Sequence, residues 1–90
     1  MNKERRKQID KLVEELSNLR GTLEDLKGVA ENLQDEEQEY YDNMPESFQS
    51  GEKGELAETA IDALDSATSD IDEAISAMDN AESNLQTAGE

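Results

Sequence analysis

The chain has 90 residues, and its 24 acidic residues against 8 basic ones give a formal net charge of −16. This length allows one small domain, and such a charge with few large apolar residues is typical of disordered chains. The absence of cysteine and histidine excludes disulfides, the usual thiol or imidazole zinc sites, and Cys or His nucleophiles. No apolar run is long enough to span a bilayer, so we expect a cytoplasmic protein without a membrane contact.

The first half of the chain carries a heptad pattern, which argues for a folded helix despite the composition. Val13 and Val29 flank a row of apolar residues in alternating steps of three and four: Ile9, Leu12, Leu16, Leu19, Leu23, Leu26, Ala30 and Leu33. This spacing predicts a helix over about residues 3–39 with one apolar seam.

Residues 40–54 interrupt the pattern and contain the only proline and two of the five glycines. We interpret this segment as a connector. Asn43 is predicted to cap a short turn between Pro45 and Gly51, and Gly54 to mark the entry into the next helix.

A second heptad row predicts another helix over about residues 55–88. The row is Ala57, Ala60, Leu64, Ala67, Ile71, Ala74, Met78, Ala81, Leu85 and Ala88, in which every second member is alanine. Small residues let two helix backbones approach, so the larger side chains of the first helix can pack there. The prediction is a single all-α domain over residues 1–90, an antiparallel helical hairpin.

One hairpin buries little apolar surface, so its stability needs a further contact. Val13, Val29, Ile61 and Ile75 widen the two seams, and a second copy could cover them. We therefore expect a homodimer that forms a four-helix bundle. A monomer stabilised by a different partner is the competing interpretation.

The second helix has no cation to offset its carboxylates. Ten acidic residues and no basic one lie between Glu55 and the end of the sequence. Six of them are predicted to form a stripe on the face opposite the seam, and these are Glu55, Glu58, Asp62, Asp65, Asp72 and Asp79. Successive members of this stripe are about 5–11 Å apart along the helix axis, which is comparable to the spacing of phosphates in a nucleic acid. The alternative is a solvated face that only keeps the protein soluble.

The basic start of the chain is expected to be neutralised within the fold. Arg5, Arg6 and Lys7 lie near a helix N-terminus, where cations are unfavourable. An antiparallel hairpin brings them toward Asp79, Glu82 and Glu90 at the end of the second helix. We therefore expect no direct nucleic-acid contact, which the net charge also opposes.

The aromatic residues gather in the connector, among acidic neighbours. Four of its side chains are expected either to plug the open end of the hairpin or to contact a partner, and different members of the set can serve the two roles. They are Tyr40, Tyr41, Met44 and Phe48. No EF-hand spacing, phosphate loop or nucleophile motif is present. We expect no enzyme activity, no cofactor and no metal site.

The run from Glu36 to Gln49, with the segments 60–64 and 71–75, resembles short acidic helical proteins of bacteriophages and prophages. This resemblance implies a phage origin and a counter-defence role. Together with the acidic stripe it suggests a non-catalytic factor that occupies the basic nucleic-acid-binding surface of a host defence complex, by DNA mimicry against CRISPR or restriction. The alternative is a coiled-coil adaptor or assembly factor that binds through its seams and its acidic-aromatic loop.

Overall fold

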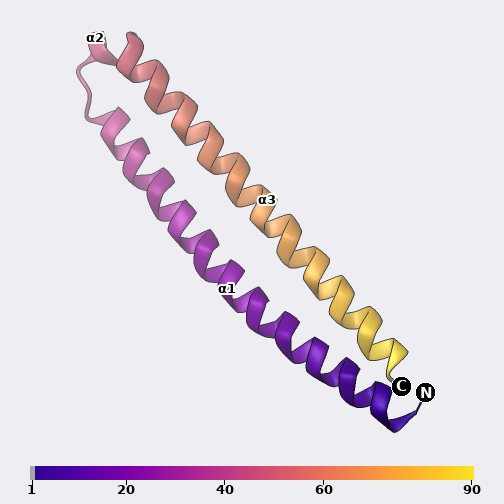
Figure 1. Cartoon of the computed structure of the whole chain (residues 1–90). Helices are drawn as coiled ribbons and strands as arrows, with labels where there is room; N and C mark the ends of the chain where they lie inside the picture. The colour runs from indigo at the N-terminus through magenta and orange to yellow at the C-terminus, as the bar shows by residue number, and fades with distance from the viewer. Residues whose placement is uncertain (1) are drawn as a thin grey trace.

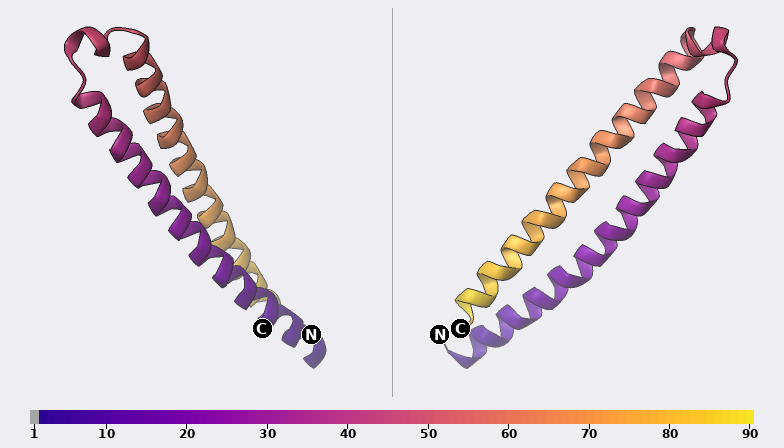
Figure 2. Two further views of the ribbon diagram at one scale, coloured as in Figure 1. Left: turned by 60° about the vertical axis from the view of Figure 1, so that its left-hand side comes forward. Right: turned by 180° about the vertical axis from the view of Figure 1, so that it is seen from behind.

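The structure, a computed structural model that describes residues 2–90, is a hairpin of two long helices (Figure 1). Helix α1 (Lys3–Asp42) is followed by the short α2 (Glu46–Gln49) and by α3 (Glu52–Ala88). The described residues contain no strand, which confirms the all-α prediction. The packing of α1 against α3 confirms the antiparallel hairpin. The molecule measures 68 × 15 × 13 Å, and both ends of the chain lie at the same end of this rod (Figure 2).

Helix α1 is capped at both ends by asparagine. Asn2 Oδ1 accepts a hydrogen bond of 2.8 Å from the Arg5 N–H, and the Asn43 N–H donates to the Glu39 carbonyl oxygen over 3.0 Å. The helix passes through both tyrosines and stops shortly before Pro45, which disfavours helical geometry in the residue before it. The prediction that Asn43 caps the short turn is wrong, because Asn43 ends α1 and Pro45 precedes α2.

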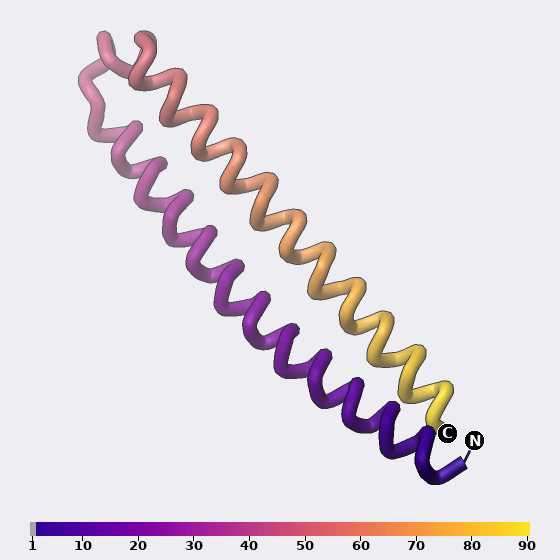
Figure 3. Tube along the Cα trace, in the orientation of Figure 1, coloured from indigo at the N-terminus to yellow at the C-terminus, as the bar shows by residue number. Residues whose placement is uncertain are grey.

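Helix α2 packs against the first turn of α3, as the Cα trace shows (Figure 3). Gly54 is buried there, and a Cβ atom on it would overlap the main chain of Gln49. Helix α3 begins at Glu52, so Gly54 lies inside its first turn and does not mark its start. The Gln49 side chain donates a 2.9 Å hydrogen bond to the Tyr41 carbonyl oxygen and ties the loop to α1.

The seam of α1 differs from the predicted one. Its half-buried side chains recur in steps of four and three: Ile9, Val13, Leu16, Arg20, Leu23, Lys27, Ala30, Gln34, Glu37 and Tyr41. The other half of the predicted row is exposed, namely Leu12 (44%), Leu19 (54%), Leu26 (51%) and Leu33 (48%). This rotation of α1 lets the apolar stems of Arg20 and Lys27 cover the seam while their charged groups reach α3.

Helix α3 is rotated in the matching direction. Ile61 and Ile75 are half-buried against α1, whereas Ala74 and Ala88 of the predicted seam are exposed. Within residues 2–90, Ala57 is the single buried apolar side chain, at 2% exposure. The hairpin therefore has a thin core.

This arrangement also changes which apolar residues remain uncovered. Val13, Ile61 and Ile75 were expected to need a second copy, but they lie in the hairpin's own seam. Val29 alone of that set is largely exposed, at 54%. Most of the uncovered large apolar side chains of α1 lie instead in the row of exposed leucines.

Candidate binding surface

The six residues of the predicted acidic stripe fall into two groups. Glu58, Asp72 and Asp79 contact side chains of α1. The prediction that they lie opposite the seam is wrong, because α3 is rotated and brings these positions to the flank of the seam. The other three are exposed and form no ion pair within the described chain, and they are Glu55, Asp62 and Asp65.

Arg20 lies between two carboxylates at one of these contacts. Its Nε is 2.7 Å from Asp79 Oδ1, an ion pair without hydrogen-bond alignment, and its Nη2 donates to Asp79 Oδ2 over 3.4 Å. On the other side, Nη1 is 3.2 Å from Glu24 Oε1, one turn along α1. The cluster joins the two helices and still carries one net negative charge.

Lys27 repeats this arrangement two turns further along. Its Nζ is 2.7 Å from Asp72 Oδ1 and 3.7 Å from Glu31 Oε1. The hydrogen bond to Asp72 raises the pKa of Lys27 above its ordinary value, with a smaller contribution from the charge of Glu31. This second cluster also retains one negative charge.

Tyr41 forms the third contact between the long helices. Its hydroxyl donates a 2.7 Å hydrogen bond to Glu58 Oε1, and this bond raises the pKa of the Tyr41 phenol. Beside the bond lies a shallow hollow of about 280 Å³, to which Gln38, Ile61 and Asp62 also contribute.

The raised pKa values of Lys27 and Tyr41 predict weaker folding in alkaline solution. Both protonated groups are stabilised by the fold, so their contribution is complete below their ordinary values of 10.5 and 10.0. This stabilising contribution is lost as the pH rises through the pKa values that the two groups have in the folded protein. We expect the melting temperature to fall as the pH is raised above about 10.

The control is a Lys27→Gln, Tyr41→Phe double variant, whose melting temperature is followed over the same alkaline range. All other side chains are the same in this variant, so their common effect on the melting temperature is subtracted. Its decline should be clearly shallower than that of the parent. Equal slopes would show that the two cross-helix contacts contribute nothing.

The three cross-helix pairs share one register. Successive members on each helix are separated by multiples of seven residues: Arg20, Lys27 and Tyr41 on α1 face Asp79, Asp72 and Glu58 on α3. The same register places half-buried Gln34 opposite exposed Asp65. At this position α1 has no cation to pair with the carboxylate, unlike at the Lys27–Asp72 and Arg20–Asp79 pairs, which lie nearer the chain ends.

A Gln34→Lys variant should complete the series. A partly exposed ion pair with Asp65 is worth up to about 1 kcal/mol, and we expect the unfolding free energy in urea to rise by that amount. The same substitution in an Asp65→Asn chain controls for the general effect of an added cation. An equal gain in both backgrounds would contradict the register.

The residues of the loop divide between the two predicted roles. Tyr41 and Met44 are half-buried at the end of the hairpin, whereas Tyr40 and Phe48 are 53% and 51% exposed. Lys53 Nζ lies 5.5 Å from the centre of the Phe48 ring, within the range of a cation–π interaction. A shallow hollow of about 240 Å³ separates the exposed aromatic rings, with Met44 and Lys53 in its wall.

The basic start of α1 is placed differently from the prediction. Arg6 Nη2 donates to the main-chain oxygen of Glu90 over 3.4 Å, as expected for an antiparallel hairpin. Asp79, however, pairs with Arg20 and not with the basic cluster at residues 5–7. The register explains this difference, because residue 20 lies about 20 Å along the axis from Arg6.

Sequence reasoning missed Arg20 and Lys27 as contact residues. The signal was the equal spacing of two cations on the first helix and two carboxylates, Asp72 and Asp79, on the second. An antiparallel hairpin can bring both pairs into contact at once only when these spacings match. Within residues 2–90, no group of three or more carboxylates is arranged to hold a metal ion.

None of the described helices combines the length and apolar character needed to cross a bilayer. No protein-family model matches the chain, and no match is found among curated proteins or solved structures.

Proposed function

We propose that this protein is a non-catalytic binding factor that occupies the basic, nucleic-acid-binding surface of another protein. The observation that carries the proposal is the charge of α3, which has carboxylates along its length and Lys53 as its only cation. The resemblance to phage proteins suggests a restriction or CRISPR complex of the host as the target.

The geometry of α3 supports this proposal in two ways. A single long helix holds the carboxylates at fixed intervals, with about 10 Å between residues seven positions apart. Glu55, Asp62 and Asp65 are free to contact a partner, since no cation within residues 2–90 forms an ion pair with them. Glu58 is also exposed beside Tyr41, between Glu55 and Asp62, so the accessible carboxylates form a continuous set at the loop end of α3.

The two cation-centred clusters extend the negative surface without weakening the fold. Each of Arg20 and Lys27 is shared by two carboxylates, so each cluster keeps a net charge of −1. Long-range attraction of a basic surface depends on this net charge. The cross-helix pairs thus hold the hairpin together and leave its field negative.

A coiled-coil adaptor is the second candidate function. The exposed leucines of α1 favour it, because large exposed apolar patches mark contacts with other proteins. The exposed rings of Tyr40 and Phe48 at the loop end provide further contact area for such a partner.

The proposal is tested by adding the protein to purified restriction and CRISPR effector complexes and measuring their DNA binding by mobility shift. We expect one complex to lose its DNA at a stoichiometric amount of the protein. The inhibition should weaken steeply between about 50 and 200 mM salt, because binding releases counterions. Salt-independent inhibition would favour the adaptor function.

A further inference from the structure

We infer that the exposed leucine row of α1 is an interface between two copies of this chain, packed with their loops at opposite ends. The leucine row consists of Leu12, Leu19, Leu26 and Leu33, which recur every seven residues. This inference is independent of the proposed function, because it uses the other side of the hairpin.

The polar pairs and the leucine row lie on opposite sides of the plane through the two helices. Leu19 and Leu26 directly precede Arg20 and Lys27, so each is turned about 100° around the axis from its neighbour. The cations reach the flank of α3 at Asp79 and Asp72. The leucines therefore lie on the other flank.

Helix α3 contributes small residues to that same flank. Residues 60, 67, 74 and 81 precede the half-buried seam positions 61, 68, 75 and 82 by one residue, as the leucines do on α1. All four are alanines, of which Ala74 is exposed and the other three are half-buried. The side of the hairpin is thus a row of large residues on one helix beside a row of small ones on the other.

This pattern is complementary to itself. A two-fold axis across the rods, which puts the loops at opposite ends, lays α1 of each copy antiparallel along α1 of the other. The two leucine rows then pack against each other, and the two alanine rows meet beside them, where small residues let the two α3 helices approach closely.

The size of the face is sufficient for a stable dimer. Tyr40, which is 53% exposed, continues the leucine row by seven residues, and Leu56, which is 65% exposed, lies on the same flank of α3 because it directly precedes the buried Ala57. From Leu12 to Tyr40 the face is about 40 Å long, and two helices with their side chains make it about 20 Å wide, more than the extent of the main chain alone. The resulting area of about 800 Å² equals what one protein contributes to a standard interface.

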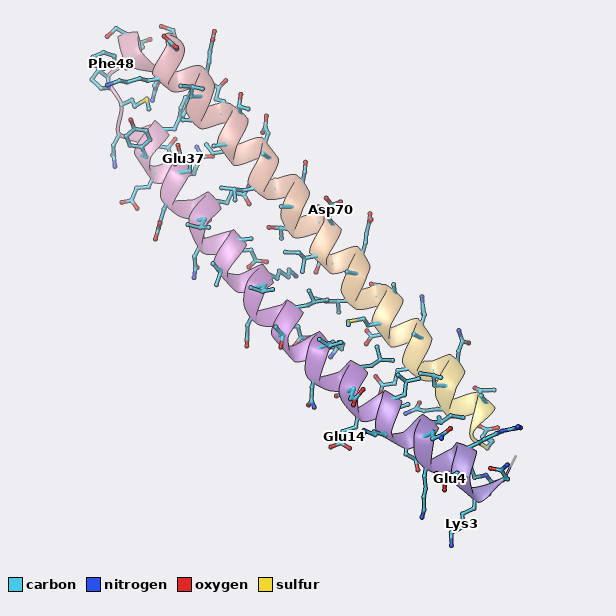
Figure 4. The ribbon with its side chains drawn as sticks, viewed as in Figure 1. Lys3, Glu4, Glu14, Glu37, Phe48 and Asp70 are labelled. Carbon is cyan, nitrogen blue, oxygen red and sulfur yellow. The ribbon has the colours of Figure 1, made fainter. Side chains whose placement is uncertain are left out.

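The distribution of charge selects the relative direction of the copies. Lys3 and Glu4 lie at the end of the rod opposite to Glu37 and Phe48 (Figure 4). Five of the eight cations occupy residues 3–11, whereas residues 31–58 hold ten carboxylates and only Lys53. Loops at the same end would bring twenty carboxylates together, whereas loops at opposite ends place each acidic end beside the end of the other copy that carries five of its eight cations.

Sedimentation equilibrium at about 10–100 μM protein tests the interface, because two copies that share a standard-size interface are expected to associate at these concentrations. The expected mass is twice 10.0 kDa. A Leu19→Gln, Leu26→Gln variant should sediment as a monomer, with its dimer dissociation constant raised at least about a hundredfold. It should stay helical by circular dichroism, since these side chains lie outside the seam.

The matched control is Asn18→Gln, Asn32→Gln, which changes exposed positions on the back of α1 and should leave the dimer intact. A monomeric parent protein at 100 μM would overturn the inference and leave the leucine row to a helix of another protein. A leucine variant that remains dimeric would overturn it as well.

The direction of the copies is tested with a single spin label on Glu4→Cys, which is unique because the chain has no cysteine. Loops at opposite ends should separate the two labels by more than about 50 Å, as the helix length requires. A distance below about 30 Å, the width of a four-helix bundle, would show that the loops lie together.

Discussion

A Gly54→Ala variant should be less stable than the parent by about 1–3 kcal/mol, although alanine is the better helix former. Gly54 is buried in the first turn of α3, and a Cβ atom there would overlap the main chain of Gln49. Because the obstacle is backbone, relief requires α2 to move away from α3. Urea unfolding at fixed protein concentration measures the loss.

Gly21 and Gly28 provide the matched controls for this variant. Both lie within α1, and a Cβ atom on either would meet open space. Alanine at these positions should therefore increase stability by about 1 kcal/mol each, through helix propensity alone. An equal gain for Gly54→Ala would show that α2 does not pack as closely as described.

The triple variant Glu55→Gln, Asp62→Asn, Asp65→Asn should bind the target at least tenfold more weakly, a loss of about 1.4 kcal/mol. These substitutions remove three free charges, keep hydrogen-bonding groups of similar size, and leave the cross-helix pairs untouched. The helices should remain folded by circular dichroism. Calorimetric titration against the complex identified by DNA displacement measures the affinity.

A charge-matched variant on the back of α1 separates a local from a general effect. Glu14→Gln, Asp25→Asn, Asp35→Asn also removes one glutamate and two aspartates from exposed positions. It should retain most of the affinity if α3 makes the contact. Equal weakening in both variants would mean that net charge alone drives the binding, and no weakening in either would favour the exposed leucines or the loop.

The helices and their hairpin pairing were predictable from the sequence because they depend on periodicity. Steps of three and four residues predict long helices, and the segment around Pro45 predicts their antiparallel return. The ends were harder to place. Asn43 is a good cap for either neighbouring helix, and only the position of α2 against Gly54 determines where each helix ends.

The rotation of each helix about its own axis could not be predicted from the apolar pattern. Two adjacent rows on α1 were available, one with four leucines and one that includes Val13, Arg20 and Lys27. A pattern based on hydrophobicity chooses the leucines. The hairpin uses the second row, since Arg20 and Lys27 contribute both apolar stems and ion pairs to α3.

This rotation determined how the candidate site differed from the prediction. It moved Glu58, Asp72 and Asp79 from the outer face to the flank of the seam, where they bind side chains of α1. It also left the leucine row uncovered. The two sides of the hairpin therefore have different chemistry, one suited to a basic protein and the other to a second copy of the chain.

The central claim is that the acidic surface and a nucleic acid occupy the same site on the target. It is tested most directly by measuring the affinity of the protein for the target at increasing concentrations of a short duplex DNA. For competition at one site, the apparent dissociation constant should rise in proportion to the DNA concentration, without limit. A rise that levels off, with target, DNA and protein in one complex, would contradict the claim.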